Sequence, residues 1–356
     1  MTRLHARLEV LEGALGQPVA GAAGAESRTF VLLSIEDEEG RVGMGEASPL
    51  PGYSPDSVDE AIDALQTFLA SPIEVDPRLP ARALLDHTAE VQLMPCPSAR
   101  FAIEAALLDW LGQVRGAPVH AMLGSAPVES IPVADLVNEP DPARWLDEVD
   151  NKVGAGWHHL KFKVGAQWAA EVDALTTVRV AHPTLGIRVD ANQRLSRLDL
   201  EGHREKLLAL ELDFFEEPVP SGSLGEVVHL SLPLAIDETL REETPSRAAL
   251  ATGAVRALVI KPTVVGGLTA ALDLAKIARA HGAEPVLSHT FDGPVARAAS
   301  AEVALAVGAT LAQGLGEHAG LALWPATEVA SIQGFEIRSH RAPGLGVTMG
   351  GRGSDA

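Results

Sequence analysis

The stretch His159-Leu160-Lys161-Phe162-Lys163-Val164-Gly165 lies near the middle of the 356-residue chain and alternates apolar with basic residues. This alternation is typical of a half-buried β-strand, in which the two lysines project to one face and the apolar residues to the other. Two enclosed ammonium groups on one face repel each other. The fold must therefore bring carboxylates or a metal ion to this strand, or lower the pKa of a lysine.

From about residue 130 onward the sequence repeats a pattern of strand, loop and helix at similar intervals. Strands are expected at residues 132–136, 158–164, 186–190, 212–216, 233–237, 257–261, 284–288 and, weakly, 310–315. Helices are expected between them, for example at residues 169–180, 270–280 and 295–307. Eight strands separated by helices favour a parallel β/α barrel, with a doubly wound sheet as the alternative.

Residues 1 to about 120 have the pattern of an α+β unit. Strands are expected at residues 4–10, 28–36 and 41–46, in an antiparallel meander. A stiff loop, residues 49–54, leads into a helix that Asp56 or Ser57 caps. A second helix is expected over residues 98–111, with Gly112 placed to end it.

Composition restricts the partners and the compartment. Because 48 acidic residues face 28 basic ones and no basic patch occurs, nucleic acid and anionic membranes are poor partners. The chain has no long apolar run and its N-terminus lacks the layout of a signal peptide, so a cytoplasmic location is expected. The single cysteine, Cys96, suits a reducing compartment. No pattern in the chain indicates an oligomeric state.

Six expected barrel strands end in a polar residue: Lys163, Asp190, Glu216, Asp237, Lys261 and Ser288. Their spacings of 27, 26, 21, 24 and 27 residues each equal about one βα unit, so these side chains should meet at one barrel mouth. Three converging carboxylates raise one another's pKa unless a cation joins them. Such an all-oxygen set suits Mg²⁺, with Mn²⁺ as a substitute. The simpler alternative, separate helix caps, explains any one carboxylate better than all three.

The use of lysine also points to proton transfer. Only six of the 28 basic residues are lysines, and three of these six, at 161, 163 and 261, lie in strand-like positions. Lysine can lose its proton inside a protein, whereas arginine effectively cannot. A divalent cation on a substrate carboxylate makes the α-proton acidic, and Lys163 and Lys261 should reach that substrate from opposite sides.

In order and spacing, five motifs resemble those of the muconate-lactonizing subgroup of the enolase superfamily: Lys-x-Lys, Asp-x-Asn, Glu-Glu-Pro, Asp-Glu-Thr and Val-Ile-Lys-Pro. The resemblance implies a modified (β/α)7β TIM barrel over residues 121–321. It also implies an α+β capping domain over residues 1–120 that the tail, residues 322–356, completes. As Mg²⁺ ligands the resemblance implies Asp190, Glu216 and Asp237. As the acid/base pair it implies Lys163 and Lys261, with Lys161 as an electrostatic neighbour. Asn192 and Glu238 are implied as residues that support the ligands.

Within this subgroup, residues 45–54 are similar to the capping-domain loop of the o-succinylbenzoate synthases of menaquinone biosynthesis. Residues 131–138 are also similar to the first barrel strand of these enzymes. This resemblance implies dehydration of a small-molecule carboxylate, 2-succinyl-6-hydroxy-2,4-cyclohexadiene-1-carboxylate. The candidate substrate contacts are Tyr53, Arg188, Ser288, Thr290 and Glu317. A structural ion pair for Arg188 and a surface role for Glu317 are equally open. Residues 288–294 depart from the Ser-Ser-x-x-Glu-Ser type motif of the family, and His289 is expected on the opposite face if the strand continues through it.

Two other interpretations stay open. An N-acylamino acid racemase or dipeptide epimerase of the same subgroup would use the same two lysines for a 1,1-proton transfer. A non-catalytic binding protein on this scaffold would be expected to lack one of the lysines or carboxylates, and none is missing.

Overall fold

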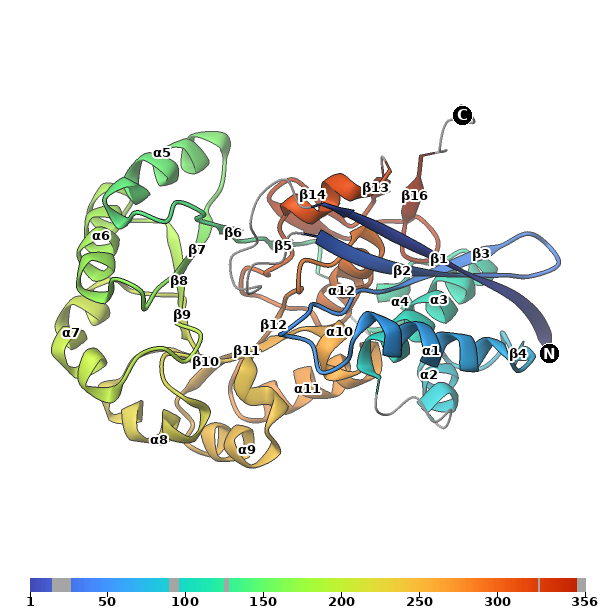
Figure 1. The fold of residues 1–356 in the computed structure, drawn as a ribbon, viewed down its shortest axis with the longest axis horizontal. Helices are drawn as coiled ribbons and strands as arrows, with labels where there is room; N and C mark the ends of the chain where they lie inside the picture. Colours follow the sequence, from blue (N-terminus) through green and yellow to red (C-terminus); the bar gives the residue numbers. More distant parts are fainter. Residues whose placement is uncertain (15–26, 90–95, 125–127, 326, 351–356) are drawn as a thin grey trace.

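The structure is a computed structural model that describes residues 1–14, 27–89, 96–124, 128–325 and 327–350. Two parts lie side by side along its longest axis (Figure 1). One is a curled parallel sheet covered by helices, and the other is an antiparallel sheet with its own helices. Within the described ranges, no helix has the length and apolar character needed to cross a membrane.

The antiparallel sheet is built from the N-terminal meander that the sequence predicts. Its strands are β1 (Thr2–Ala14), β2 (Ser27–Glu36), β3 (Val42–Ala47) and β4 (Ile73–Val75), in the order β3-β2-β1-β4. Helices α1 (Val58–Leu69), α2 (Ala81–Ala89), α3 (Pro97–Arg115) and α4 (Val119–Leu123) follow. Ser57, one of the two predicted caps, begins α1 in a capping box with Glu60.

The helix predicted over residues 98–111 corresponds to α3, and the prediction that Gly112 ends it is wrong. Helix α3 continues to Arg115, and Gly116, with φ +61°, follows it in the left-handed region. A β-carbon at Gly112 would lie 2.5 Å from the backbone of Gly344. Gly112 therefore allows close packing between α3 and the C-terminal tail.

Strand β3 lies directly against α3 through its glycines. A β-carbon at Gly45 would lie 1.8 Å from the carbonyl oxygen of Ala102, and one at Gly43 would lie 2.2 Å from that of Ala106. We expect Gly45→Ala to lower the free energy of unfolding by about 1–3 kcal/mol or more, because backbone would have to move apart. The matched control is Gly154→Ala in helix α5 (Trp145–Ala155), where a β-carbon would meet no atom of the described residues outside its own helix within 4 Å.

Gly154→Ala should leave stability unchanged or raise it by up to about 1 kcal/mol, because alanine favours a helix. Chemical denaturation of both variants measures the difference. A Gly45→Ala protein as stable as the wild type would contradict the close contact between β3 and α3.

The parallel sheet has seven strands in consecutive order, β6 to β12. They are β6 (Asp135–Leu136), β7 (His159–Lys163), β8 (Gly186–Asp190), β9 (Phe214–Glu216), β10 (Leu234–Ile236), β11 (Val255–Ile260) and β12 (Glu284–Leu287). The predicted eighth strand, residues 310–315, forms only isolated bridges, Ser288 to Gly314 and Gln313 to Val133. These bridges connect the β12 side of the sheet to the β6 side. The predicted barrel is thus confirmed, and the doubly wound sheet is excluded because the strand order never reverses.

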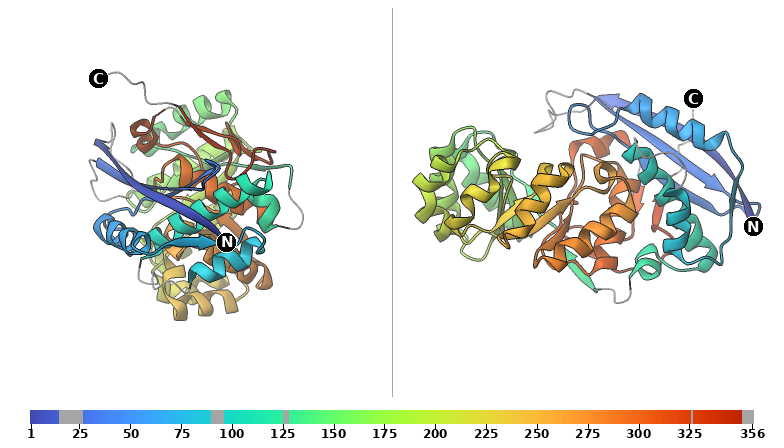
Figure 2. Two further views of the ribbon diagram at one scale, coloured as in Figure 1. Left: turned by 90° about the vertical axis from the view of Figure 1, so that its right-hand side faces the viewer. Right: turned by 90° about the horizontal axis from the view of Figure 1, so that it is seen from below.

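Helices lie outside these strands (Figure 2). The α-helices after α5 are α6 (Trp168–Ala181), α7 (Arg197–Ala209), α8 (Leu224–Val227), α9 (Glu243–Ala251), α10 (Pro262–Val265), α11 (Leu268–Ala280) and α12 (Pro294–Val307). Short 3-10 helices occupy Pro142–Arg144, Ser221–Ser223, Val228–Leu230, Glu238–Arg241 and Ala319–Leu323. In β7, Phe162 is buried and contacts Trp145 of α5, with ring centroids 5.1 Å apart. The two lysines of β7 lie on its other face, as the alternation predicts.

The C-terminal tail joins both parts. Strands β13 (Thr327–Val329) and β16 (Val347–Met349) pair with each other, while β14 (Ile332–Gln333) and β15 (Glu336–Arg338) form a sheet with β5 (Ser130–Pro132). The buried Glu302 of α12 bonds to His120 of α4 at 2.8 Å and to His340 of the tail at 2.7 Å. The division into domains at residues 1–120 and 121–321 stays a prediction.

Candidate active site

A cavity of about 320 Å³ lies at the C-terminal ends of the barrel strands, beside Leu50 and Tyr53 of the cap loop, residues 45–54. Ten predicted site residues line it: Tyr53, Lys161, Lys163, Arg188, Asn192, Glu238, Lys261, Ser288, Thr290 and Glu317. The three candidate metal ligands are buried, and each bonds to a lysine of the lining. The fold thus brings together all the residues that the sequence predicts for the site.

The two lysines of β7 bond to carboxylates of the next two strands. The ammonium nitrogen of Lys161 lies 2.7 and 2.9 Å from the Glu216 oxygens and 2.8 Å from Oδ2 of Asp190. The ammonium nitrogen of Lys163 lies 2.6 Å from the same Asp190 oxygen and 2.8 Å from Oδ1 of Asn192. Carboxylates therefore compensate the two like charges that the β7 sequence places on one face.

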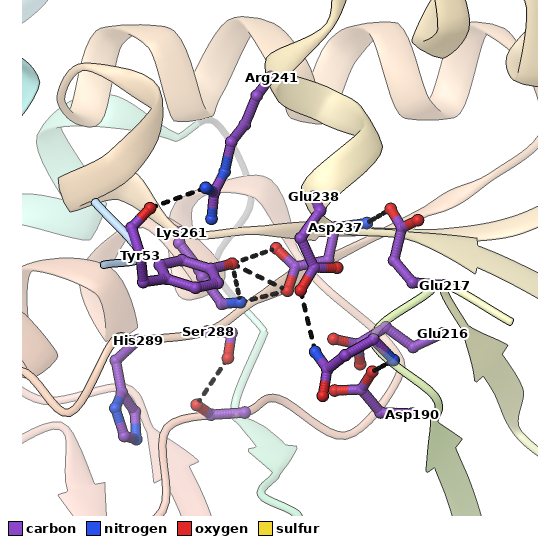
Figure 3. A network of polar contacts seen from close by, with 12 residues as sticks. Tyr53, Asp190, Glu216, Glu217, Asp237, Glu238, Arg241, Lys261, Ser288 and His289 are labelled. Atoms are coloured by element: carbon purple, nitrogen blue, oxygen red, sulfur yellow. Dashed lines mark hydrogen bonds and ion pairs between the residues drawn. The ribbon is translucent and has the colours of Figure 1, made fainter. Parts of the chain in front are cut away.

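Asp237, after β10, faces Lys261, after β11 (Figure 3). The ammonium group of Lys261 bonds to Oδ2 of Asp237 and lies 2.5 Å from the hydroxyl of Tyr53. This hydroxyl is 3.1 and 3.2 Å from the Asp237 oxygens. Arg241 stacks on the Tyr53 ring at 3.9 Å and donates to its carbonyl oxygen at 2.7 Å. These contacts hold the cap loop against the barrel mouth.

The charges of the site perturb one another strongly. Burial and the neighbouring Asp190 raise the pKa of Glu216 to about 8. Burial opposes ionisation of Asp190 too, but Lys161 and Lys163 lower the pKa of that carboxyl. Burial alone would lower the pKa of Lys161 and Lys261, yet the carboxylates around them raise both. A lowered lysine pKa, one of the ways to accommodate the two lysines that the sequence leaves open, would thus require a cation that takes over these carboxylates.

The donor set fits a hard divalent cation. Asp190, Glu216 and Asp237 offer only oxygen ligands, as Mg²⁺ and Mn²⁺ prefer. Beside them, Glu238 accepts from the Asn192 side chain at 2.9 Å, and its other oxygen is buried and has no hydrogen-bond partner within the described part of the chain. The three carboxylates are neighbours but do not converge on one point. Across the described residues, only His120, Glu302 and His340 place three possible ligand atoms all within 4.8 Å of one another.

Glu217 is a candidate functional residue for which the sequence pattern predicts no role. Its fully buried carboxylate accepts from the backbone N–H groups of Asp237 and Thr239, both at 2.7 Å, and from the Thr239 hydroxyl at 2.8 Å. The side-chain amide of Gln193 donates to it at 3.1 Å. Glu217 therefore fixes the loops after β8 and β10. A signal for it exists, because consecutive glutamates at a strand end point to opposite faces.

We expect Glu217→Gln to weaken Mg²⁺ binding by about 10- to 100-fold, as removal of a supporting hydrogen bond typically does. The amide oxygen can still accept from the two backbone N–H groups, but the NH₂ group cannot accept from the Thr239 hydroxyl or the Gln193 side chain, so the loops after β8 and β10 would be held less firmly. Calorimetric titration with Mg²⁺ measures the effect, and Glu205→Gln, on an exposed side chain of α7, is the control. Equal Mg²⁺ affinity in both variants would contradict this role.

Arg188 lies deeper in the barrel, two residues before Asp190 on β8. Its guanidinium donates to the carbonyl oxygen of Ala312 at 2.8 Å and stacks on Phe214 at 5.1 Å. Its Nε is buried and has no hydrogen-bond partner in the part of the chain that the structure describes. Among the described residues Arg188 forms no ion pair, so the structure does not support the structural ion pair that the sequence left open. Glu317 is exposed and also lines the cavity.

The condition for an opposite-facing His289, a strand that continues through this residue, is not met. Strand β12 ends at Leu287, so the alternation does not extend to His289, which lines the cavity. Its Nδ1 accepts from the backbone of Phe291 at 2.9 Å, and its Nε2 lies 3.2 Å from the carbonyl oxygen of Gly316. Burial lowers the pKa of His289 well below its usual value. The hydroxyls of Ser288 and Thr290 donate within the protein, at 3.2 Å to Gly314 and at 2.7 Å to Asp292.

Arg28 is a second residue that the sequence analysis missed. It is buried in β2 and donates to the carbonyl oxygens of Ser48 and Pro49, both at 2.7 Å. It also donates to the carbonyl oxygen of Thr290 at 2.9 Å. Arg28 therefore holds the cap loop and the loop after β12, which both line the cavity. Only its position in an apolar strand distinguishes it in the sequence.

Fold and site together define a class of enzyme: a β/α barrel with buried carboxylates on three consecutive strands, between strands that carry lysines. Residues 144–352 match the enolase C-terminal domain-like family. Residues 10–124 match the N-terminal domain family of mandelate racemase and muconate lactonizing enzyme. The chain belongs to this family, within the muconate-lactonizing subgroup of the enolase superfamily.

Its relatives catalyse different reactions. The chain is 26% identical to an N-succinyl-L-Arg/Lys racemase of Bacillus cereus over 292 residues, 77% of this chain and 76% of that protein. It is 30% identical to an o-succinylbenzoate synthase of Proteus mirabilis over 273 residues, 75% of each. A crystal structure of a dipeptide epimerase from Methylococcus capsulatus, complexed with Mg and L-Arg-D-Lys, aligns with a TM-score of 0.86 at 25% identity, over 98% of this chain and 99% of that one.

Proposed function

We propose that this protein is an o-succinylbenzoate synthase, a cytoplasmic lyase of menaquinone biosynthesis. The observation that carries the proposal is the placement of Lys163 and Lys261. Strands β8, β9 and β10 separate β7 from β11 on one side of the barrel, and β12, residues 310–315 and β6 separate them on the other. The two lysines therefore face each other across the cavity.

The carboxylates between these lysines complete the proposed site. Asp190, Glu216 and Asp237 would hold Mg²⁺, which when bound neutralises a substrate carboxylate and makes the adjacent C–H bond acidic. Lys161, bonded to Asp190 and Glu216, fixes these two side chains. Tyr53 closes the cavity from the cap loop and reaches Lys261 and Asp237.

Lys163 would carry both proton transfers of the dehydration. Its free amine removes the proton α to the substrate carboxylate, and the resulting ammonium group returns the proton to the hydroxyl on the same face. The C–O bond breaks, water leaves, and the ring becomes aromatic. Lys261 lines the cavity on the opposite side, where it would lie against the ring as a cation and supply a positive charge on that face.

Two further observations support this choice among the activities of the family. The cap loop, residues 45–54, is similar to that of o-succinylbenzoate synthases and delivers Tyr53 to the cavity. The relative from Proteus mirabilis bears this activity by name.

The test is a steady-state assay of the full chain with 2-succinyl-6-hydroxy-2,4-cyclohexadiene-1-carboxylate, with Mg²⁺ and with a chelator. We expect formation of o-succinylbenzoate only when Mg²⁺ is present. Absence of dehydration, together with efficient racemisation of N-succinyl amino acids, would overturn the proposal.

Racemisation of N-succinyl amino acids is the second candidate function. It is favoured by the placement of Lys261, which approaches from the face opposite Lys163 and has its own carboxylate partner. A base on each face is what a 1,1-proton transfer requires. The experiment is to incubate each enantiomer of a panel of N-succinyl amino acids in D₂O and follow α-proton exchange and optical rotation. Exchange from one enantiomer only would exclude a two-base racemase.

A further inference from the structure

Arg194 differs from the other cations of the cavity because its guanidinium has no partner among the described residues. The other cavity cations are all engaged. Lys161 and Lys163 bond to Asp190, Lys261 bonds to Asp237, and Arg188 donates to the carbonyl oxygen of Ala312. An exposed arginine that lines a cavity retains its full capacity to donate to a ligand.

The local backbone holds Arg194 at the cavity mouth. Positive φ angles at Asn192 (42°) and Gln193 (64°) turn the chain sharply after β8. The turn is closed by hydrogen bonds from the backbone N–H of Arg194 to Ala191 at 3.0 Å and from that of Gln193 to Glu217 at 2.8 Å. A β-carbon at Gly165 would lie 3.0 Å from the β-carbon of Arg194, so the start of its side chain lies against Gly165. Arg194 therefore approaches the cavity from the side of Lys163.

Arg194 stands outside the proposed metal site but beside it. The carboxylates that would bind the cation, Asp190, Glu216 and Asp237, are buried and bonded to lysines. A substrate carboxylate drawn to a cation held there would lie on the inner side of the cavity. A second anionic group of the same molecule can then reach the planar, bidentate guanidinium of Arg194.

We propose that Arg194 binds a second carboxylate of the substrate and so selects molecules that carry a succinyl group. This inference rests on the proposed function and deepens it. The cyclohexadiene substrate and N-succinyl amino acids both carry this second carboxylate. A zwitterionic dipeptide offers an ammonium group in its place, which Arg194 repels.

The test compares ligands that differ only at the distal group. Mg²⁺-loaded full-length protein is titrated with o-succinylbenzoate and with 2-butanoylbenzoate, in which a methyl group replaces the distal carboxylate. We expect the wild type to prefer o-succinylbenzoate. Arg194→Gln should weaken the binding of o-succinylbenzoate by about 10-fold or more, the usual effect of losing a hydrogen bond between charged groups. It should leave the binding of 2-butanoylbenzoate unchanged.

Arg194→Lys should retain part of the preference, because it keeps the charge but not the planar fork. Arg197→Gln, at an exposed position of α7 paired with Glu201, is the matched control and should change neither affinity. An equal loss for both ligands in Arg194→Gln, or no loss, overturns the role of Arg194.

The same comparison is made with N-succinyl-phenylalanine and N-butanoyl-phenylalanine, so the test does not depend on which reaction the enzyme catalyses. Absence of dehydration with a preserved, Arg194-dependent preference for the succinyl ligands would refute the proposed activity alone. A wild type that shows no preference in either pair would refute the proposal for Arg194 alone if dehydration is intact.

Discussion

Lys163→Arg is expected to lower kcat by about 100- to 10,000-fold while the protein keeps its fold, since this is what a positioned general base typically contributes. Arginine keeps the positive charge that Asp190 and Asn192 contact at 2.6 and 2.8 Å. It effectively cannot lose its proton, so it cannot remove one from a substrate. Steady-state kinetics with saturating Mg²⁺ measure the loss.

Lys163→Ala should be as inactive as Lys163→Arg, because both remove the titratable amine. Lys206→Arg, at an exposed position of α7 paired with Asp173, is the control and should retain wild-type activity. Circular dichroism and thermal unfolding establish that the inactive variants are folded. Near-wild-type kcat in Lys163→Arg would refute the assignment of Lys163 as the base.

Asp237→Asn is expected to weaken Mg²⁺ binding by more than about 100-fold, beyond the usual effect of changing a residue that only supports a ligand. The substitution removes a buried negative charge and one of the three proposed ligands. It also leaves Lys261 without its carboxylate partner. Mg²⁺ should therefore be repelled by the Lys261 ammonium group as well as meet a poorer ligand set. Calorimetric titration of metal-free protein with Mg²⁺ gives the affinity.

The control for Asp237→Asn is Asp63→Asn on the exposed face of α1, which should bind Mg²⁺ like the wild type. Because an unpaired buried lysine is costly, thermal unfolding is measured alongside. Glu216→Gln gives a second, independent removal of a proposed ligand. Unchanged Mg²⁺ affinity in a folded Asp237→Asn protein would remove Asp237 from the ligand set.

The sequence by itself determined the barrel and the residues of its mouth. Strand periodicity is local, so the two faces of β7 follow from residues 159–165 alone. The strands of a β/α barrel end at one mouth, so regular spacing was enough to bring Asp190, Glu216 and Asp237 near the lysines. The weak signal of residues 310–315 likewise matched a segment that forms only isolated bridges.

Only the tertiary structure decided what supports and shapes the site. Glu217 and Arg28 act through hydrogen bonds to residues that are distant in sequence, such as Thr239 and Thr290, and no local pattern encodes such partners. Gly112 looked like a helix end, but close contact with Gly344 explains it. Beyond the end of a strand, the direction of a side chain depends on the turn that follows. Whether a cationic side chain has a hydrogen-bond partner depends on the residues that the fold places around it. For these reasons the position of His289 in the cavity wall, and the lack of a guanidinium partner for Arg194 among the described residues, could be read only from the folded chain.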